Sequence, residues 1–238
     1  MREPFRALLL AAGLGTRLRP ITSHTPKCLV SVGGEPLLQR WLRKLEQAGC
    51  DSVLINTHYL AEEVKTFLRG WPSSTMGINT VHEPELLGTA GTLLANQKFF
   101  QGTTGLLVHA DNAMAGDITE FLAAHHVRQP CCQLTMLTFE TDTPKSCGIV
   151  EIDSQQVVQG FHEKVGKPPG NRANGALYAF EQDLLDHLNL MNPIPSDFST
   201  EVIPTLLGRI QAWHTNKAYI DIGTPDSLKK AQQLLKKQ

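Results

Sequence analysis

Apolar runs of strand length alternate with amphipathic stretches of helical length through the first half of the chain. The runs that we predict to be strands are residues 7–12, 52–56, 78–82 and 105–109, and the predicted helices are residues 36–48, 61–68, 90–100 and 118–126. Strands that alternate with helices of this length are typical of an α/β fold, in which helices cover both faces of a mostly parallel sheet. Ligands of such a sheet bind beyond the carboxyl ends of its strands. Gly13, Glu83 and Asp111 each follow a predicted strand, so one crevice could hold all three.

The second half of the chain is richer in strands with short connections. The predicted strands there are residues 133–139, 149–152, 157–161, 176–180, 210–214 and 219–222, and the predicted helices are residues 184–188 and 201–207. A last helix begins at Thr224-Pro225-Asp226, which is a cap residue, a first-turn proline and an acidic residue in sequence. A chain of 238 residues is long enough to bury a core. We therefore expect one α/β domain over residues 1–238, with a β-rich accessory part in residues 131–238.

Composition excludes several classes of protein. The formal net charge is −1 and 41% of the residues are hydrophobic, so we expect no general nucleic-acid or membrane surface. The 5 cysteines show no CxxC spacing, which favours reduced thiols over a disulfide framework or a zinc site. The opening Met-Arg-Glu-Pro leads into an apolar run that is too short for a signal peptide or a membrane span. We expect a cytoplasmic protein.

The loop after the first predicted strand carries two glycines and is followed by three basic residues. Backbone N–H groups near Gly13 and Gly15 can approach an anion closely because no side chain stands in the way. Arg17, Arg19 and Lys27 supply the charge that a triphosphate needs. The pattern indicates a phosphate-binding loop. The alternative is a glycine-rich turn with solvated arginines.

This loop differs from the two common phosphate-binding loops. It lacks the Lys-Ser/Thr ending of a P-loop, and Leu18 stands where a dinucleotide-binding fingerprint has its third glycine.

Six segments, in order along the chain, resemble the signature motifs of the sugar-1-phosphate nucleotidylyltransferases. They are residues 8–20 with 25–27, 83–91, 109–112, 161–164, 174–178 and 219–225. The chain departs from the family pattern at His109-Ala110, where Gly or Asn often precedes the aspartate, and at Val165, where a proline is usual. The chain ends soon after the last motif, so we expect it to lack the β-helix domain of some relatives.

The resemblance implies a Rossmann-like nucleotide-diphospho-sugar transferase fold, with a nucleotide-binding half in residues 1–130 and a sugar-phosphate-binding half in residues 131–238. It also implies a reaction in which an oxygen of a sugar 1-phosphate attacks the α-phosphorus of a nucleoside triphosphate and pyrophosphate leaves. Two polyanions must be brought together, so positioning and charge neutralisation dominate the chemistry.

The resemblance implies Mg²⁺ as cofactor and a catalytic set of four residues. Mg²⁺ favours one or two carboxylates together with phosphate oxygens, and Asp111 and Asp221 each follow an apolar strand. The alternative for each aspartate is a carboxylate that caps a neighbouring helix. Arg17 would hold the β- and γ-phosphates, and Lys27 would stabilise charge between the two substrates.

The resemblance extends to the two substrate-binding sets. The implied nucleotide-binding residues are Ala11, Ala12, Gly13, Gly15, Thr16, Arg17, Glu83, Gly88, Thr89, Ala90 and Asp111. The implied sugar-phosphate-binding residues are Gly148, Glu163, Lys164, Asn174 and Thr200. In the second set, Lys164 would bind the phosphate and Glu163 would accept the sugar hydroxyls.

Several of these residues have simpler interpretations that the sequence leaves open. Arg19 could form a surface ion pair, and Glu163-Lys164 could be a solvated ion pair. Asn174-Gly175 is also a common turn dipeptide. The segment 197–201 could complete the sugar pocket or could be a helix N-terminus.

Glu83 carries our expectation about the base. Related uridylyl and thymidylyl enzymes tend to have Gln at this position. A carboxylate only accepts hydrogen bonds, and guanine offers two adjacent donors, whereas uracil and thymine present one donor flanked by acceptors. We therefore expect GTP, with a mannose or manno-heptose 1-phosphate as acceptor. The segments 197–201 and 219–225 also look closest to such guanylyltransferases. The alternative for Glu83 is a carboxylate that braces its loop.

Two other functions stay open at this point. One is a CTP- or UTP-dependent enzyme of the same type that acts on another sugar or alcohol phosphate. The other is a non-catalytic relative that binds nucleotide sugar as a regulatory subunit. Such relatives typically lose a basic loop residue or a metal-binding carboxylate, and this chain retains both kinds. A homodimer is kept open as the oligomeric state.

Overall fold

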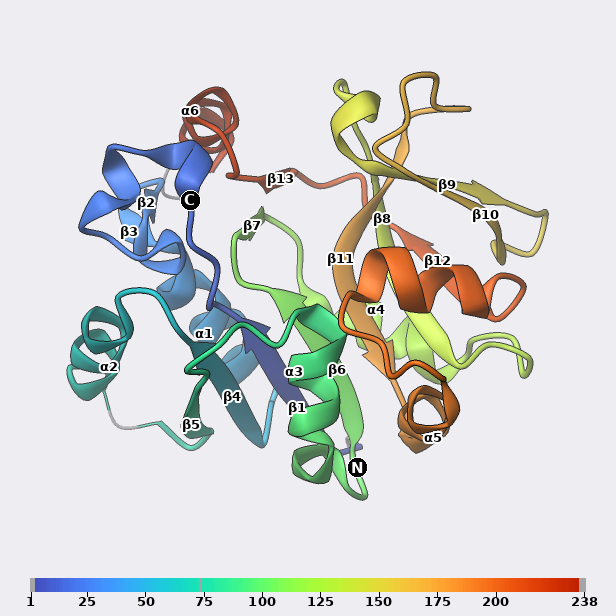
Figure 1. Cartoon of the computed structure of the whole chain (residues 1–238), viewed down its shortest axis with the longest axis horizontal. Helices are drawn as coiled ribbons and strands as arrows, with labels where there is room; N and C mark the ends of the chain where they lie inside the picture. Colours follow the sequence, from blue (N-terminus) through green and yellow to red (C-terminus); the bar gives the residue numbers. More distant parts are fainter. Residues whose placement is uncertain (1–2, 73, 236–238) are drawn as a thin grey trace. The chain divides into compact units, whose positions relative to one another are not determined.

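The computed structural model describes residues 3–72 and 74–235, so the first two residues of the opening Met-Arg-Glu-Pro lie outside the described residues. Contacts group the chain into two compact units whose segments are interleaved along the sequence (Figure 1). The parallel-sheet unit contains Pro4–Leu86, Val108–Ile118 and 217–235, and the antiparallel-sheet unit contains Glu3, Leu87–Leu107 and Thr119–Asn216. The division of one domain near residue 130 stays a prediction.

Three parallel strands form the centre of the parallel-sheet unit. They are β1 (Phe5–Leu10), β4 (Ser52–Thr57) and β5 (Gly77–His82), and β4 pairs with both of the others. Helices α1 (Leu37–Gln47) and α2 (Ala61–Arg69) follow β1 and β4 in the chain. The apolar residues of α1 recur at helical spacing, and Trp41 and its neighbours on that face are buried. The predicted α/β class, with a mostly parallel central sheet, is confirmed.

A second small sheet lies in the same unit. Strand β7 (Asn112–Met114) pairs antiparallel with β13 (Tyr219–Asp221), and the register sets Asp221 opposite Asn112. Helix α6 (Pro225–Leu234) follows, and Thr224 forms a capping box with Ser227, as the sequence predicts for this helix start. Strand β7 and the short pair β2 (Ser31–Val32) and β3 (Glu35–Pro36) were not predicted, because two or three residues carry no periodic pattern.

The antiparallel-sheet unit contains most of the remaining strands. They are β8 (Leu134–Glu140), β9 (Gly148–Ile152), β10 (Val158–Glu163), β11 (Arg172–Phe180) and β12 (Ile210–His214). Strand β11 pairs antiparallel with β8 and β9, β9 pairs antiparallel with β10, and β12 pairs parallel with β8. Its helices are α3 (Thr89–Ala95), α5 (Gln182–Leu190) and α4 (Ile118–His126) from Thr119 on. Strand β6 (Thr104–His109) is divided between the two units.

Two predicted helices are wrong in their extent. The helix expected over 90–100 ends at Ala95, where the side chain of Asn96 donates to the carbonyl of Thr92, and a 3₁₀ turn follows. The helix expected over 201–207 is instead a π turn, Phe198–Val202, followed by a 3₁₀ turn, Ile203–Leu206. Pro204 lacks the N–H that a helix interior needs, so a regular helix over this span is disfavoured.

No helix in residues 3–72 and 74–235 is long and apolar enough to cross a membrane.

Candidate active site

The glycine loop after β1 is followed by short 3₁₀ turns rather than by a helix. Gly15 has a φ of 62°, and a Cβ there would lie 2.9 Å from Cγ2 of Thr22. The Thr22 hydroxyl donates to the carbonyl of Gly15 at 2.6 Å. Both backbone conformation and space therefore require glycine at position 15. Gly13 is exposed, and a Cβ there would meet nothing within 4 Å, so packing alone does not require glycine at this position.

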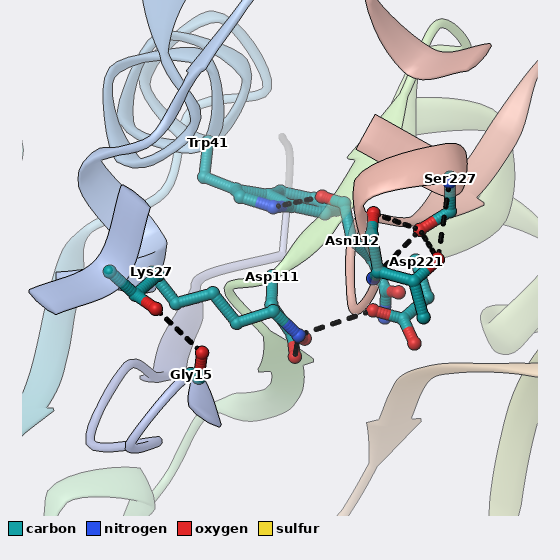
Figure 2. Close-up of polar contacts among 9 residues, drawn as sticks. Gly15, Lys27, Trp41, Asp111, Asn112, Asp221 and Ser227 are labelled. Atoms are coloured by element: carbon teal, nitrogen blue, oxygen red, sulfur yellow. Dashed lines mark hydrogen bonds and ion pairs between the residues drawn. The ribbon is translucent and has the colours of Figure 1, made fainter. Parts of the chain in front are cut away.

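Lys27 lies between two carboxylates that are far away in the sequence (Figure 2). Its Nζ is 2.5 Å from Oδ2 of Asp111 and 3.3 Å from Oδ1 of Asp221. Asp111 follows β6 and Asp221 ends β13, and the pairing of β13 with β7 brings the two together. The N–H of Ile222 also donates to the carbonyl of Asp111 at 3.1 Å. The structure therefore brings three of the four catalytic residues implied by the sequence into direct contact.

Electrostatics keep Lys27 and Asp111 ionised. Burial by itself would lower the pKa of Lys27, but the carboxylates of Asp111 and Asp221 outweigh that effect and hold its pKa above the ordinary value. Burial by itself would raise the pKa of Asp111, but the Lys27 ammonium and the neighbouring His109 hold that pKa below the ordinary value. Two carboxylates thus share one ammonium, and the cluster can accept further positive charge.

The two aspartates fit a divalent cation. Both carboxylates already contact one cationic atom, the Nζ of Lys27, so a cation placed between them can contact both. No group of three or more His, Cys, Asp or Glu side chains suited to a metal occurs in the part of the chain that the structure describes. Mg²⁺ in particular is commonly held by one or two carboxylates and completed by water and phosphate oxygens. The donor set is therefore of the kind that this ion uses.

Arg17 lies beside the same cluster. A Cβ added at Gly223 would be 2.8 Å from Nη2 of Arg17 and 2.9 Å from Oδ2 of Asp221. Glycine at position 223 thus gives room to the guanidinium and to the carboxylate. The residues next to Arg17 in the sequence differ in burial. Leu18 is buried and anchors the turn, whereas Thr16 and Arg19 are exposed.

A buried chain of hydrogen bonds connects the glycine loop to Glu83. The N–H of Ala11 donates to Oδ1 of Asn56 at 2.7 Å, and Nδ2 of Asn56 donates to Oε1 of Glu83 at 3.0 Å. Asn56 and Glu83 are each 3% exposed. Ala12, the next loop residue, is also buried. The hydrogen bond from Asn56 is what we expect if Glu83 braces its loop. The carboxylate of Glu83 still only accepts hydrogen bonds, so its proposed contact with the base stays a prediction.

Asn56 is a candidate functional residue that the sequence reasoning missed. It lies at the carboxyl end of β4, where ligands of a parallel sheet bind. The available signal was the amide side chain of Asn56 directly after the apolar run Val53–Ile55, because a polar residue that is buried at the end of a strand needs partners.

In the antiparallel-sheet unit, Glu163 and Lys164 form an ion pair of 2.8 Å. The side chain of Lys164 is 63% exposed, whereas that of Glu163 is only 23% exposed, so Glu163 is not part of a simple solvated pair. Gly148 lies opposite Glu163 in the register of β9 and β10. A Cβ at Gly148 would lie 2.5 Å from Oε2 of Glu163, so glycine there makes room for the carboxylate.

Asn174 lies at an irregularity in β11. Its Nδ2 donates to the hydroxyl of Tyr178 at 2.7 Å, and its Oδ1 accepts from the N–H of Ala176 at 2.9 Å. The register of β11 against β8 shifts between Asn174 and Tyr178, and Ala176 has a φ of 53°. The predicted strand 176–180 therefore starts earlier than expected, at Arg172, and contains the turn-like feature that Asn-Gly also suggested.

The segment Gly88 to Ala90 packs on the segment around Ser196 within the same unit. The N–H of Ala90 donates to the carbonyl of Ser196 at 2.9 Å, and Oγ1 of Thr89 accepts from the N–H of Phe198 at 2.7 Å. Gly88 has a φ of 78°, and a Cβ there would lie 2.4 Å from the carbonyl oxygen of Ser196. These contacts give the three residues a structural role, and their binding to nucleotide stays a prediction.

Thr200 lies in a tightly bonded turn. Oδ1 of Asp197 accepts from both the N–H and the hydroxyl of Thr200, at 2.7 and 2.8 Å. Oε2 of Glu201 accepts from the N–H groups of Ser196 and Asp197, and these bonds hold the pKa of Glu201 below its ordinary value. The capping interpretation of this segment thus describes the local structure, while sugar binding by Thr200 stays a prediction.

Comparison with known proteins gives one family. A family model described as nucleotidyl transferase matches residues 6–238. The chain is 28% identical over 224 residues to the mannose-1-phosphate guanylyltransferase catalytic subunit beta of Drosophila pseudoobscura pseudoobscura, covering 92% of this chain and 59% of that protein. It is 27% identical over 224 residues to the mannose-1-phosphate guanylyltransferase of Mycobacterium tuberculosis, covering 92% and 61%. It is 28% identical over 244 residues to a UTP–glucose-1-phosphate uridylyltransferase of Synechocystis, covering 93% and 61%. The chain spans about three fifths of the length of these curated relatives.

Two solved structures share the fold. A putative glucose-1-phosphate thymidylyltransferase from Bacillus anthracis, in complex with a sucrose, has a TM-score of 0.86 at 21% identity, covering 98% of this chain and 96% of the other. HddC from Yersinia pseudotuberculosis has a TM-score of 0.80 at 24% identity, covering 96% and 98%. At these identities the likeness concerns the fold, and it confirms the Rossmann-like architecture that the sequence motifs imply.

Proposed function

The chain belongs to the nucleotidyl transferase family, and on that premise we propose that it transfers a nucleoside monophosphate from GTP to a manno-configured sugar 1-phosphate, with release of pyrophosphate. The observation that carries the proposal is the convergence of Lys27, Asp111 and Asp221, which is suited to binding and neutralising phosphate groups. Curated relatives include mannose-1-phosphate guanylyltransferases, which favours this donor and acceptor.

The chemistry needs charge stabilisation more than proton transfer. An ionised oxygen of the sugar phosphate attacks the α-phosphorus, and the bond from that phosphorus to the pyrophosphate oxygen breaks. The nucleophile already carries negative charge, so no general base has to remove a proton. We propose that the Lys27 ammonium stabilises charge on the reacting phosphate oxygens and that the Arg17 guanidinium binds the β- and γ-phosphates.

We propose Mg²⁺ as the cofactor, held by Asp111 and Asp221. Bound there, the ion would neutralise phosphate oxygens and orient them. Lys27 would then donate to a phosphate oxygen in place of one of its carboxylate partners, which keeps its ammonium hydrogen-bonded throughout. Gly13, where an added Cβ would meet nothing within 4 Å, leaves the backbone of the loop accessible to the triphosphate.

The sugar 1-phosphate is assigned to residues of the antiparallel-sheet unit. Lys164 has the exposed ammonium that a phosphate needs, and Glu163 offers a half-buried carboxylate for sugar hydroxyls. Asn174 is positioned by Tyr178, and Thr200 by Asp197, so both side chains are held in one orientation. A sugar with neighbouring hydroxyls suits such a set of donors and acceptors.

The acceptor-only chemistry of Glu83 supports guanine as the base. A second candidate is a uridylyltransferase acting on another sugar phosphate, which the similarity to the Synechocystis enzyme favours. Action in the cytoplasm and a homodimer remain parts of the proposal.

The test is pyrophosphate release by the purified protein with Mg²⁺ across a matrix of GTP, UTP, CTP and dTTP against mannose, heptose and glucose 1-phosphates. Products are identified by mass. We expect turnover with GTP and a manno-configured acceptor, and loss of that turnover in Asp111→Asn. Turnover with UTP or CTP but not GTP would exclude the guanylyl assignment, and no turnover with any pair would exclude the function.

A further inference from the structure

We propose that Asn56 is a positioning residue that determines base specificity, because it fixes which hydrogen-bonding atoms position 83 can offer to the base. This inference rests on the proposed function, since it concerns the nucleotide that the protein selects. It is carried by the buried relay from Ala11 through Asn56 to Glu83, all of whose members lie in the parallel-sheet unit.

The orientation of the Asn56 amide is forced by its partners. The backbone N–H of Ala11 can only donate, so the amide oxygen of Asn56 must face it, at 2.7 Å. The amide nitrogen then faces position 83, where it donates to Oε1 of Glu83 at 3.0 Å. Asn56 is 3% exposed, so bulk water does not compete for its amide group. Position 83 must therefore present an acceptor to Asn56.

The backbone at position 83 is fixed as well. The N–H of Glu83 donates to the carbonyl of Thr57 at 2.8 Å, and Nδ1 of His58 donates to the carbonyl of Glu83 at 2.8 Å. The parallel pairing of β1 with β4 sets Leu10 opposite Asn56, which places Ala11 beside the amide. The relay thus starts at Ala11 in the glycine loop and ends at the Glu83 carboxylate, which we propose to bind the base. Hydrogen bonds fix the orientation of the groups between them.

The chemistry at position 83 follows from this constraint. A glutamate satisfies Asn56 with one oxygen, and every remaining hydrogen-bonding site of its carboxylate is an acceptor, which suits the N1–H and N2–H₂ donors of guanine. A glutamine in the same place must turn its oxygen toward Asn56. Its NH₂ group would then be the part offered to the base, and an NH₂ group suits the carbonyl acceptors of uracil or thymine.

The same argument predicts that a second substitution reverses the first. In Asn56→Asp, one carboxylate oxygen accepts from Ala11 and the other oxygen faces position 83 as an acceptor. In the double variant Asn56→Asp with Glu83→Gln, the introduced glutamine must turn its NH₂ inward to satisfy that oxygen. Its own oxygen then becomes the atom offered to the base, as in the parent protein. The preference for GTP over UTP should therefore be lost in Glu83→Gln and recovered in the double variant.

The experiment measures the ratio of kcat/KM for GTP to kcat/KM for UTP in the full chain with Mg²⁺ and the sugar phosphate that the substrate matrix identifies. Binding of each triphosphate alone, by calorimetry, gives a readout independent of turnover. We expect Glu83→Gln to lower the GTP to UTP ratio by about 10- to 100-fold. We expect the double variant to recover the ratio to within a few fold of the parent value.

The matched control is Asn79→Asp, which makes the same change of charge on the adjacent strand β5. Asn79 is exposed and donates to the hydroxyl of Ser52, away from the relay. The GTP to UTP ratio of Asn79→Asp should therefore equal that of the parent protein. Asn56→Asp alone places two carboxylates opposite each other, and we expect it to lose both stability and GTP binding.

Three results would overturn the inference. One is an unchanged ratio in Glu83→Gln, which would make Glu83 only a brace of its loop. Another is failure of the double variant to recover the ratio. The last is failure of Glu83→Gln to fold, because the relay predicts that the introduced glutamine keeps its bond with Asn56. A parent protein that prefers UTP would instead overturn the guanylyl proposal alone, since the inference concerns the change in the ratio and not its starting value.

Discussion

Lys27 shows how one residue can serve two sets of partners. Its side chain is 10% exposed and its ammonium is neutralised by Asp111 and Asp221, so the buried charge is tolerated without a bound ligand. The same two carboxylates are the ones proposed to hold Mg²⁺. A divalent cation and the ammonium therefore compete for the same oxygens until a phosphate gives Lys27 a new partner.

This competition predicts the effect of Lys27→Met. Removal of the ammonium leaves two carboxylates without their cation, so the affinity of the nucleotide-free protein for Mn²⁺ should rise by at least about tenfold. Turnover should fall at the same time, because the reacting phosphates lose the ammonium. Electron paramagnetic resonance of free Mn²⁺ measures the first effect. Lys65→Met, which removes an exposed lysine paired with Glu62, should leave it unchanged, and equal Mn²⁺ affinity in both variants would contradict the competition.

Gly223 is a residue whose importance lies in the absence of a side chain. Gly223→Ala would place a Cβ within 2.8 Å of the Arg17 guanidinium and 2.9 Å of the Asp221 carboxylate, and both flexible ends would have to move. We expect thermal stability close to that of the parent protein and a fall in kcat/KM of about 10- to 100-fold, since small displacements of charged groups are costly. Gly170→Ala, which meets nothing within 4 Å, is the control. Normal turnover in Gly223→Ala would contradict the proposal that Arg17 binds the phosphates.

At the scale of elements, a short strand that the sequence did not reveal helps to position the charged cluster. Strand β7 is only three residues long, yet its pairing with β13 sets Asp221 next to Asp111. Helix α1 holds β7 from one side, because Nε1 of the buried Trp41 donates to the carbonyl of Asn112 at 2.8 Å (Figure 2). The strongest predicted helix thus stabilises the strand that the sequence did not reveal.

The contact between α1 and β7 can be tested with Trp41→Phe. The variant removes the indole N–H from a buried site and leaves a small cavity, so the free energy of unfolding should fall by about 2 kcal/mol. Urea unfolding followed by circular dichroism measures this. Trp71→Phe is the matched control: within the described residues the buried Nε1 of Trp71 has no hydrogen-bond partner, so that variant should cost clearly less. Equal losses would show that the bond to Asn112 contributes nothing.

At the scale of the whole molecule, the residues proposed to bind the ligands are divided between the two units. The parallel-sheet unit contains the glycine loop, Lys27, Glu83 and both aspartates, and the antiparallel-sheet unit contains the residues proposed for the sugar phosphate. Both units contain buried apolar residues, and strand β6 is divided between them. Lys27, Glu83 and both aspartates are proposed for the nucleotide and its metal, so binding of these two can be tested without the second substrate.

Thermal unfolding gives this test. A ligand that binds only the folded protein stabilises it by about 2.7 kcal/mol when its concentration is 100 times its Kd. GTP with Mg²⁺ should therefore raise the Tm of the protein in the absence of sugar phosphate, and chelation of the metal should remove most of that rise. In Asp221→Asn the rise should be smaller at the same concentrations. An equal rise with and without metal would argue against a metal held jointly by the protein and the nucleotide.

The long elements could be predicted because each one carries its own periodic pattern. Strands β1 and β4 and helix α1 lie within a few residues of their predicted bounds. The predictions were wrong where a local hydrogen bond ends a pattern, as at Asn96. They were also wrong in the segment 198–206, where Pro204 and the local hydrogen bonds of Asp197 and Glu201 replace a regular helix. Such events depend on hydrogen bonds that periodicity does not record.

The order of residues along the chain determined the family motifs, the apolar strands and the chemical identity of the candidate groups, because these are properties of local sequence. Only the tertiary structure decided that Lys27 stands between Asp111 and Asp221, which are 84 and 194 residues away from it. Only the tertiary structure placed Asn56 between the glycine loop and Glu83. Hydrogen bonds and ion pairs form between groups that are close in space, and strand pairing between distant segments sets that closeness.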